Sequence, residues 1–297
     1  NQVSFVSQGI ISYLAGQKSV LNQSSYSSVE ELKAAGLNMQ METVVEEIDT
    51  KNKRLFYRRV NSKKTKLALY DKLIFATGSY PAMTSVPFDK KSKLYFLKSM
   101  DDAIKTDEFL KTAKNIAVIG GGMTGVEVAR IAQERGIQTT LIHRNKNLLN
   151  DYLDEPASHL LESWMNAEGT RLLLNTEVTE IGFDEENTII QTANGQKIPV
   201  DGVIFTIGFR PNSYLLNQQV ELGDSGAVIV DEYMQTSCPD VFAVGDVSTT
   251  YVNLLEKSYY LPHASDAVRD GEIAAINLLA PRQKINSSQG TYHVPMK

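Results

Sequence analysis

The chain has 297 residues, 42% of them hydrophobic and 22% charged, which is enough apolar material for the cores of two domains. A formal net charge of -5, with lysine and arginine scattered among acids, offers no basic field for phosphates, so we expect no nucleic-acid partner. No apolar run approaches the roughly 18 residues of a membrane helix and no signal peptide is recognisable, so we expect a cytoplasmic protein without a membrane span.

The first 83 residues predict short helices and strands. Residues 10–14 are typical of a helix, and Ser28 and Gly36 fit the start and stop of a second one. Strands are expected near 39–45 and 54–57. The apolar run 72–78, followed by Pro81, is expected to be a buried strand that leaves its domain.

A different pattern begins at Asn115. Residues 115–144 read strand, glycine turn, helix and strand, which is one βαβ unit. A helix over 154–169 follows, with Pro156 in its first turn. Asn194-Gly195 predicts a hairpin between two alternating segments, and 202–209 predicts a closing strand. Residues 226–230, 236–246 and a helix over 263–279 indicate a return to the first domain.

The glycine turn carries the strongest local signal. Gly120, Gly122 and Gly125 form a GxGxxG motif directly after an apolar strand, at the start of a helix. The first glycine permits a tight turn, the second lets a pyrophosphate approach the backbone, and the third lets helix and strand pack closely. The motif therefore predicts a dinucleotide site; the alternative is a glycine-rich turn without a ligand.

The end of the second strand departs from the NAD pattern. An acid normally holds the ribose 2'-hydroxyl about 20 residues after such a motif, but this strand ends in His143 and Arg144. A basic pair suits the 2'-phosphate of NADPH, since charged hydrogen bonds are the stronger ones. The alternative is a solvated pair at a strand end.

Four motifs in order resemble the pyridine nucleotide-disulfide oxidoreductases, in the branch of NADH oxidase, NADH peroxidase and coenzyme A-disulfide reductase. They are YDKLIFATGSYP, GGGMTGVE, IGFRPN and TSCPDVFAVGD, and the similarity reaches about residue 280. The resemblance implies an α/β fold with two Rossmann-like three-layer domains, the NAD(P) domain being inserted in the FAD domain. We expect the FAD domain over 1–111 and 233–280, the NAD(P) domain over 112–232, and the start of an interface segment over 281–297.

The resemblance also implies the cofactors, FAD and NADPH (or NADH), and positions that contact them. Glu127 is expected near the stacked nicotinamide and flavin, with a plain first-turn helix acid as its alternative, and Gly208 near the nicotinamide. Met123 replaces the aromatic residue that often shields the flavin. The positions implied at the FAD are Val45, Ala76, Thr77, Gly78, Asp246 and Ala264. For Asp246 the alternative is a turn or capping residue, and Ala264 begins a helix whose N-terminus favours the charge of reduced flavin.

Three departures accompany this resemblance. The first FAD glycine motif, about 30 residues before Ser4, and the C-terminal interface domain are absent, so we expect the chain to be a fragment. The position of the family's redox cysteine is Gln8, which cannot form a thiolate or a disulfide.

The single cysteine, Cys238, lies in a turn and is expected to be structural; it allows no internal disulfide or thiolate cluster. The four histidines show no metal-ligand spacing, and no metal is expected.

The sequence therefore predicts an NAD(P)H-dependent flavoprotein oxidoreductase that passes electrons to a small-molecule or oxygen acceptor without a cysteine relay. A homodimer is expected when the interface domain is present. Two alternatives stay open: a non-catalytic nucleotide-binding or regulatory module, and a disulfide or peroxide reductase that uses a cysteine outside this chain.

Overall fold

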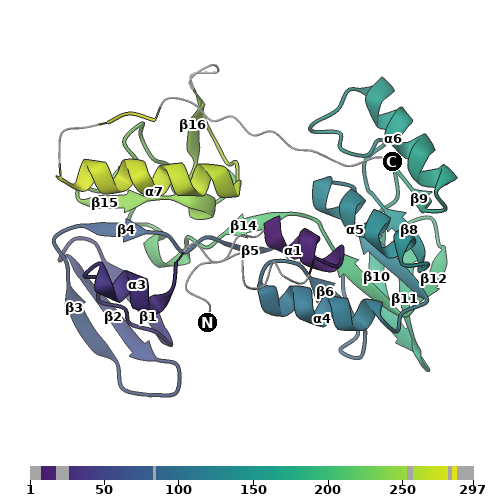
Figure 1. Cartoon of the computed structure of the whole chain (residues 1–297), viewed down its shortest axis with the longest axis horizontal. Coiled ribbons are helices and arrows are strands. Elements are labelled where there is room, and N and C mark those ends of the chain that lie inside the picture. Colours follow the sequence, from purple (N-terminus) through teal and green to yellow (C-terminus); the bar gives the residue numbers. More distant parts are fainter. Residues whose placement is uncertain (1–7, 18–26, 83–84, 253–256, 280–282, 286–297) are drawn as a thin grey trace. The chain divides into compact units, whose positions relative to one another are not determined.

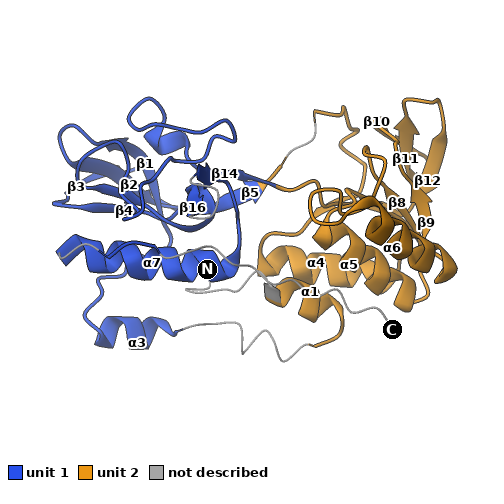
Figure 2. Cartoon of the chain, turned by 90° about the horizontal axis from the view of Figure 1, so that it is seen from above, with its two compact units in different colours: residues 1–4, 27–80, 209–293 blue, residues 5–26, 81–208, 294–297 orange. Residues whose placement is uncertain are grey.

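The computed structural model describes residues 8–17, 27–82, 85–252, 257–279 and 283–285. It divides into two compact units (Figure 2). Unit 1 comprises 1–4, 27–80 and 209–293, and unit 2 comprises 5–26, 81–208 and 294–297. These limits follow packing and do not coincide with the predicted domain limits, which remain predictions. Among the described residues, no helix is both long and apolar enough to cross a bilayer.

Unit 2 is built on a parallel sheet of five strands in the order β6-β13-β7-β8-β9. Figure 1 labels three of them, β6, β8 and β9. The strands are β6 (Leu94–Phe96), β13 (Gly202–Phe205), β7 (Asn115–Ile119), β8 (Gln138–Ile142) and β9 (Arg171–Leu173). The central strands are near-continuous apolar runs, as a sheet covered on both faces requires.

Two different layers cover this sheet. One face packs on helices α1 (Gln8–Leu14), α4 (Met100–Leu110), α5 (Met123–Glu134) and α6 (Glu155–Ala167). The other face packs on an antiparallel sheet of β10 (Val178–Asp184), β11 (Asn187–Thr192) and β12 (Lys197–Val200). Successive residues of β7 serve opposite layers, since Ile116 and Val118 join the helical core while Ala117 joins the other. Unit 2 is thus the three-layer, Rossmann-like fold that the sequence predicts.

Helix α1 belongs to unit 2 although it precedes most of unit 1 in the chain. Its residues Ile10, Tyr13 and Leu14 are buried in the helical core. The Arg135 guanidinium donates to the carbonyl of Leu14 and, over 2.8 Å, to the buried carboxylate of Asp107. One arginine therefore fastens the end of α1 to α4 and to the C-terminal end of α5.

The described residues of unit 1 form four short sheets and two helices. An antiparallel meander joins β1 (Thr43–Asp49), β2 (Arg54–Arg59) and β3 (Lys66–Leu69). Two-stranded sheets pair β4 (Leu73–Phe75) with β15 (Val241–Ala243), β5 (Ser79–Pro81) with β14 (Phe209–Pro211), and β16 (Thr250–Val252) with β17 (Lys257–Tyr259). The helices are α3 (Val29–Ala34) and α7 (Ala264–Leu279), with 3-10 turns η1 (Tyr214–Leu216) and η2 (Gly245–Val247).

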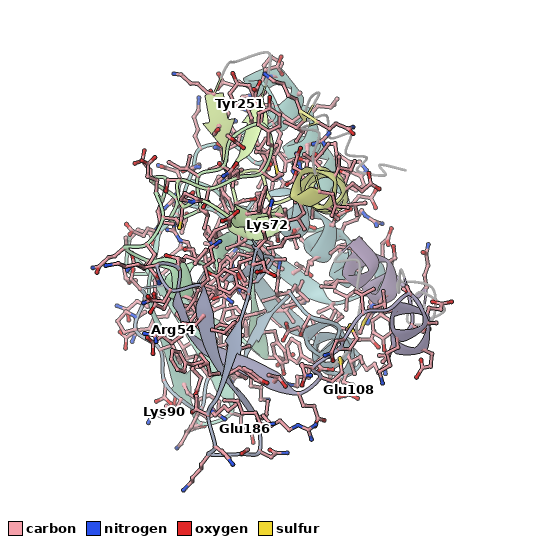
Figure 3. All side chains as sticks on the ribbon, turned by 90° about the vertical axis from the view of Figure 1, so that its left-hand side faces the viewer. Arg54, Lys72, Lys90, Glu108, Glu186 and Tyr251 are labelled. Atoms are coloured by element: carbon pink, nitrogen blue, oxygen red, sulfur yellow. The ribbon has the colours of Figure 1, made fainter. Side chains whose placement is uncertain are left out.

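The core of unit 1 forms where the parallel pair β4 and β15 meets α7. Phe75, Val241 and Ile273 share one buried cluster. Lys72, labelled in Figure 3, donates from Nζ to the Leu278 carbonyl at 3.1 Å. The start of β4 is thereby tied to the end of α7.

Most predicted elements are present, with shifts at their ends. The Asn194-Gly195 hairpin joins β11 to β12, with Gly195 at a φ of 83°, and the helix expected from about residue 263 is α7. The strand expected near 39–45 begins only at Thr43, because Glu42 adopts a φ of 52°, which ends extended pairing.

Candidate functional site

The turn between β7 and α5 in unit 2 can be made only by glycine at two positions. Gly120 has a φ of 118°, and a Cβ there would lie 2.5 Å from the Thr206 carbonyl oxygen. A Cβ on Gly125 would lie 1.8 Å from the Gly120 carbonyl oxygen. The first and third glycines of the motif are therefore required by backbone conformation and close packing.

Gly122 is different, because a Cβ there would meet no atom within 4 Å. It is the N-cap residue of α5, and no side chain caps the helix. Backbone N–H groups at an uncapped helix start attract anions. The second glycine thus leaves open space directly before a helix terminus, which is what a diphosphate requires.

His143 and Arg144 have unlike surroundings at the end of β8. His143 is half-buried and bonded within the protein at both ring nitrogens, to the N–H of Gly121 at 3.0 Å and to the side chain of Asn150 at 3.1 Å. Arg144 is exposed. The two members of the predicted basic pair therefore differ, since His143 is bonded within the protein and Arg144 is exposed.

Arg144 borders a depression of about 430 Å³ on unit 2. The depression lies where β8 and β9 end, and parallel sheets bind ligands at the carboxyl ends of their strands. Most of its lining residues are polar, and one of them is an acid, Glu177. The lining residues are Arg144, Asn145, Asn175, Thr176, Glu177, Ala193 and Asn194.

The residues predicted near the nicotinamide lie on α5 and after β13. Glu127 is buried in α5, with 8% of its surface exposed, and Met123 opens the helix and packs partly against the core. Gly208 has a φ of 94°, and its carbonyl accepts a hydrogen bond from the N–H of Ala82 at 2.9 Å. A Cβ on Gly208 would meet nothing within 4 Å, so its backbone is open to a ligand.

Two motifs separated by more than 160 residues meet in unit 1. Ala76, Thr77 and Gly78 follow β4, and the next residue, Ser79, donates from Oγ to the carboxylate of Asp246 over 2.8 Å. The Thr77 hydroxyl and the Gly78 carbonyl both bond the backbone of Asn212, at 2.7 and 2.9 Å. Ser79 therefore links the end of the first motif to Asp246, while Asn212 fixes the turn at Thr77 and Gly78.

A half-buried tyrosine, Tyr260, lies in this cluster. Burial, together with the nearby charge of Asp246, raises the pKa of Tyr260 to about 12, so its phenol stays protonated. A hydrogen bond with Ser79 and the charge of Arg210 lower the pKa of the same hydroxyl, but by less than these two causes raise it. Sequence reasoning missed Tyr260 and Ser79, because neither residue type is distinctive in a strand or a loop.

Helix α7 carries two buried acids. Asp270 is 1% exposed, and its Oδ2 accepts a 3.4 Å hydrogen bond from the N–H of Gly245, beside Asp246. Burial raises the pKa of Asp270 to about 6. Asp266 is ion-paired with Arg269 at 2.7 Å and lies 3.6 Å from His263. Acids four residues apart on the apolar face of 263–279 were a signal that the sequence reasoning passed over.

The remaining predicted positions lie apart from these clusters. Val45 is partly buried in β1 and packs against the core of unit 1. Ala264 begins α7. Gln8 begins α1, but its side chain and residues 1–7 lie outside the described part of the chain. Cys238 is half-buried in the turn before β15, with Sγ 3.8 Å from the Pro239 carbonyl oxygen.

Comparison with known proteins assigns the family. A family model described as pyridine nucleotide-disulphide oxidoreductase matches residues 4–271. The chain belongs to this family. Members that resemble it include the NADH oxidase of Enterococcus faecalis, 35% identical over 292 residues that make up 98% of this chain and 66% of the relative. The chain spans about two thirds of the length of such relatives, 63% for the NADH oxidase of Lactococcus lactis.

Solved structures of family members have the same fold. The water-forming NADH oxidase of Lactobacillus brevis, bound to NADH, superposes with a TM-score of 0.91 at 33% identity and covers 94% of this chain and 62% of that one. An engineered water-forming NADPH oxidase derived from it, bound to NADPH, gives the same values. The chain therefore has the FAD/NAD(P)-binding α/β fold of this oxidoreductase family.

Proposed function

We propose that the full-length protein is an FAD-dependent NAD(P)H oxidoreductase that passes electrons to oxygen or another small acceptor without a cysteine relay. When bound, FAD supplies a ring that accepts hydride from the nicotinamide and gives up electrons singly or in pairs. The observation that carries the proposal is the open, uncapped start of α5 at Gly122, which fits a dinucleotide diphosphate. Relatives named NADH oxidase support oxygen as the acceptor.

In this proposal unit 2 binds the nicotinamide nucleotide. Gly120, Gly122 and Gly125 form the diphosphate turn, while Glu127 and Gly208 lie beside the nicotinamide. The burial of Glu127 and the open backbone at Gly208 fit these roles. The proposed task of these residues is to bind and orient the ring and to exclude water from it.

Arg144 is proposed to select NADPH over NADH. It is an exposed cation beside a polar depression at the carboxyl ends of β8 and β9, where a ribose phosphate could lie. A guanidinium binds phosphate through charged, bidentate hydrogen bonds. The engineered NADPH-binding relative shows that this fold accepts either nucleotide.

Unit 1 is proposed to hold the flavin through its Ala76-Thr77-Gly78 turn, Asp246, Val45 and the start of α7 at Ala264. The backbone hydrogen bonds of Thr77 and Gly78 fix the turn, and the Ser79 hydroxyl fixes one oxygen of Asp246. A carboxylate has about four lone-pair sites, so Asp246 can accept a hydrogen bond from a hydroxyl of the FAD ribityl chain in addition to its bonds within the protein. We also propose cytoplasmic location and a homodimer for the full-length protein.

One experiment tests the proposal directly. Full-length, FAD-loaded protein is mixed anaerobically with NADPH while flavin absorbance is followed. Rapid bleaching is expected. Binding of the nucleotide without bleaching would instead support the second candidate, a non-catalytic binding module, which Gln8 at the redox-cysteine position favours. Bleaching followed by fast turnover of disulfide or peroxide would indicate a thiol outside this chain.

A further inference from the structure

The ring of His143 lies against the glycine turn. The N–H of Gly121 donates to Nδ1 over 3.0 Å, so Nδ1 carries no proton. Nε2 lies 3.1 Å from Oδ1 of Asn150, an acceptor, so the ring proton belongs on Nε2. This pattern of hydrogen bonds specifies a neutral imidazole in one tautomer.

Packing fixes the ring as firmly as the hydrogen bonds do. A Cβ on Gly121 would lie 2.7 Å from Cγ of His143 and 2.6 Å from Cδ2 of Leu148. Gly121 lies between the first two glycines of the GxGxxG motif, at a position where the motif accepts any residue. The motif therefore does not explain why residue 121 is a glycine. The ring of His143 explains it, because it occupies the space of any side chain at 121.

The segment after β8 closes around the same peptide. The N–H of Leu149 donates to the Gly121 carbonyl at 2.9 Å, and Asn145 donates to Oδ1 of Asn150 at 2.9 Å. Both backbone polar groups of Gly121, its N–H and its carbonyl, are therefore hydrogen-bonded. Neither nitrogen of His143 can reach a ribose or a phosphate without first giving up a bond to the protein.

We infer that His143 is a positioning residue: as a neutral acceptor it holds the diphosphate turn in shape, and it does not read the nucleotide's 2' group. This inference rests on the proposed nucleotide site and assigns selectivity to Arg144 alone. His143 then supports binding of both nucleotides equally. An acid at the same position in an NAD-specific protein would instead contact the ribose.

Two variants of His143 distinguish the contribution of its aromatic ring from that of its hydrogen-bond acceptor, Nδ1. His143→Phe keeps an aromatic ring and removes the acceptor, whereas His143→Asn removes the ring and places an amide oxygen near the position of Nδ1. Arg144→Gln is the control for selectivity. Dissociation constants for NAD⁺ and NADP⁺ are measured by calorimetry on full-length, FAD-loaded proteins, with thermal melting as the check on folding.

We expect His143→Phe to weaken both nucleotides by about tenfold with their ratio unchanged, as loss of one hydrogen bond implies. His143→Asn should stay within about threefold of the parent protein, and Arg144→Gln should weaken NADP⁺ alone. The inference is overturned if either His143 variant binds NADP⁺ more weakly while its affinity for NAD⁺ is unchanged. It is also overturned if His143→Phe and His143→Asn lose affinity for the nucleotides equally. If the parent protein binds neither nucleotide, the proposed function itself fails and takes the inference with it.

Discussion

The hydroxyl of Ser79 donates to the carboxylate of Asp246 across 2.8 Å and so joins the first residue of β5 to the η2 turn after β15. Both groups are partly buried, and a hydrogen bond to a charged group contributes on the order of 1.5 to 3 kcal/mol. We expect Ser79→Ala to lower the free energy of unfolding by that order and to speed flavin release. Urea melting and flavin fluorescence measure the two effects. The exposed Ser85→Ala is the control, and equal behaviour of the two variants would remove the role given to Ser79.

Arg144→Glu should narrow or reverse a preference for NADPH over NADH by roughly one to two powers of ten, since it replaces an attraction to phosphate with a repulsion. The matched control is Arg171→Glu, the same charge change at an exposed residue at the start of β9, the opposite end of the strand. Calorimetric titration gives both affinities. Equal affinity of the parent protein for NADH and NADPH would contradict the prediction.

Substitutions at the second and third motif glycines should have different effects, one on nucleotide binding and the other on stability. Gly122→Val is expected to fold, because a Cβ there meets nothing within 4 Å, but its side chain should fill the diphosphate space and abolish nucleotide binding. Gly125→Ala should instead lower stability by about 1 to 3 kcal/mol, because its Cβ would lie 1.8 Å from a backbone oxygen. Melting curves and nucleotide titrations distinguish the two outcomes. Unchanged binding by Gly122→Val would mean that the turn is only structural.

Asp270 should make stability depend on pH. Its pKa rises from 3.8 to about 6 on folding, so between these values the unfolded chain loses the proton while the folded protein keeps it. Stability therefore falls as pH rises through this window, and the full cost, on the order of 2 to 3 kcal/mol, is present above it. Asp270→Asn should melt higher than the parent at pH 8 and at the same temperature near pH 4. A constant difference across that range would show that Asp270 does not titrate there.

The glutamine at position 8 leads us to predict that oxygen is reduced to hydrogen peroxide. A cysteine at this position can reduce peroxide through covalent sulfur intermediates, and glutamine cannot. We expect full-length, FAD-loaded protein to make nearly one hydrogen peroxide per NADPH oxidised in air, with no long-wavelength thiolate-to-flavin band on partial reduction. Gln8→Cys should introduce that band. Rapid peroxide or coenzyme A disulfide reduction by the parent protein would show that another thiol has taken the role.

Periodicity and glycine chemistry predict the parallel core of unit 2 well, because each signal is local. The strand 115–119, the turn and the helix that follows are adjacent in sequence, and so are Asn194 and Gly195. The sequence reasoning passed over α4, although Ser99 and Asp102 form a capping box at its start, with a 2.8 Å bond from the Ser99 N–H to the Asp102 carboxylate. It also passed over β3, whose exposed residues Lys66, Leu67 and Leu69 show no alternation.

The contacts within the candidate site could not be predicted from local sequence signals alone. The motif positions were evident, but the engagement of both nitrogens of His143 depends on where Asn150 lies after a loop, which no periodicity encodes. The pairing of Ser79 with Asp246 spans 167 positions, and the burial of Asp270 follows from packing of α7. Residue type gave the chemistry of these groups, and tertiary contacts decided which atoms remain available to a ligand.

The attachment of Leu14 to Arg135 bears on how the chain folds as it is synthesised. The two residues are 121 positions apart. At about 5 to 20 residues per second, a ribosome needs roughly 6 to 24 seconds to produce the arginine after the leucine. Until α4 and α5 are made in the last part of that interval, the apolar side chains of Ile10, Tyr13 and Leu14 lack the helices that they pack against. The emerging chain thus presents an exposed apolar segment for many seconds, and this is the stage at which chaperone binding would matter most for its yield.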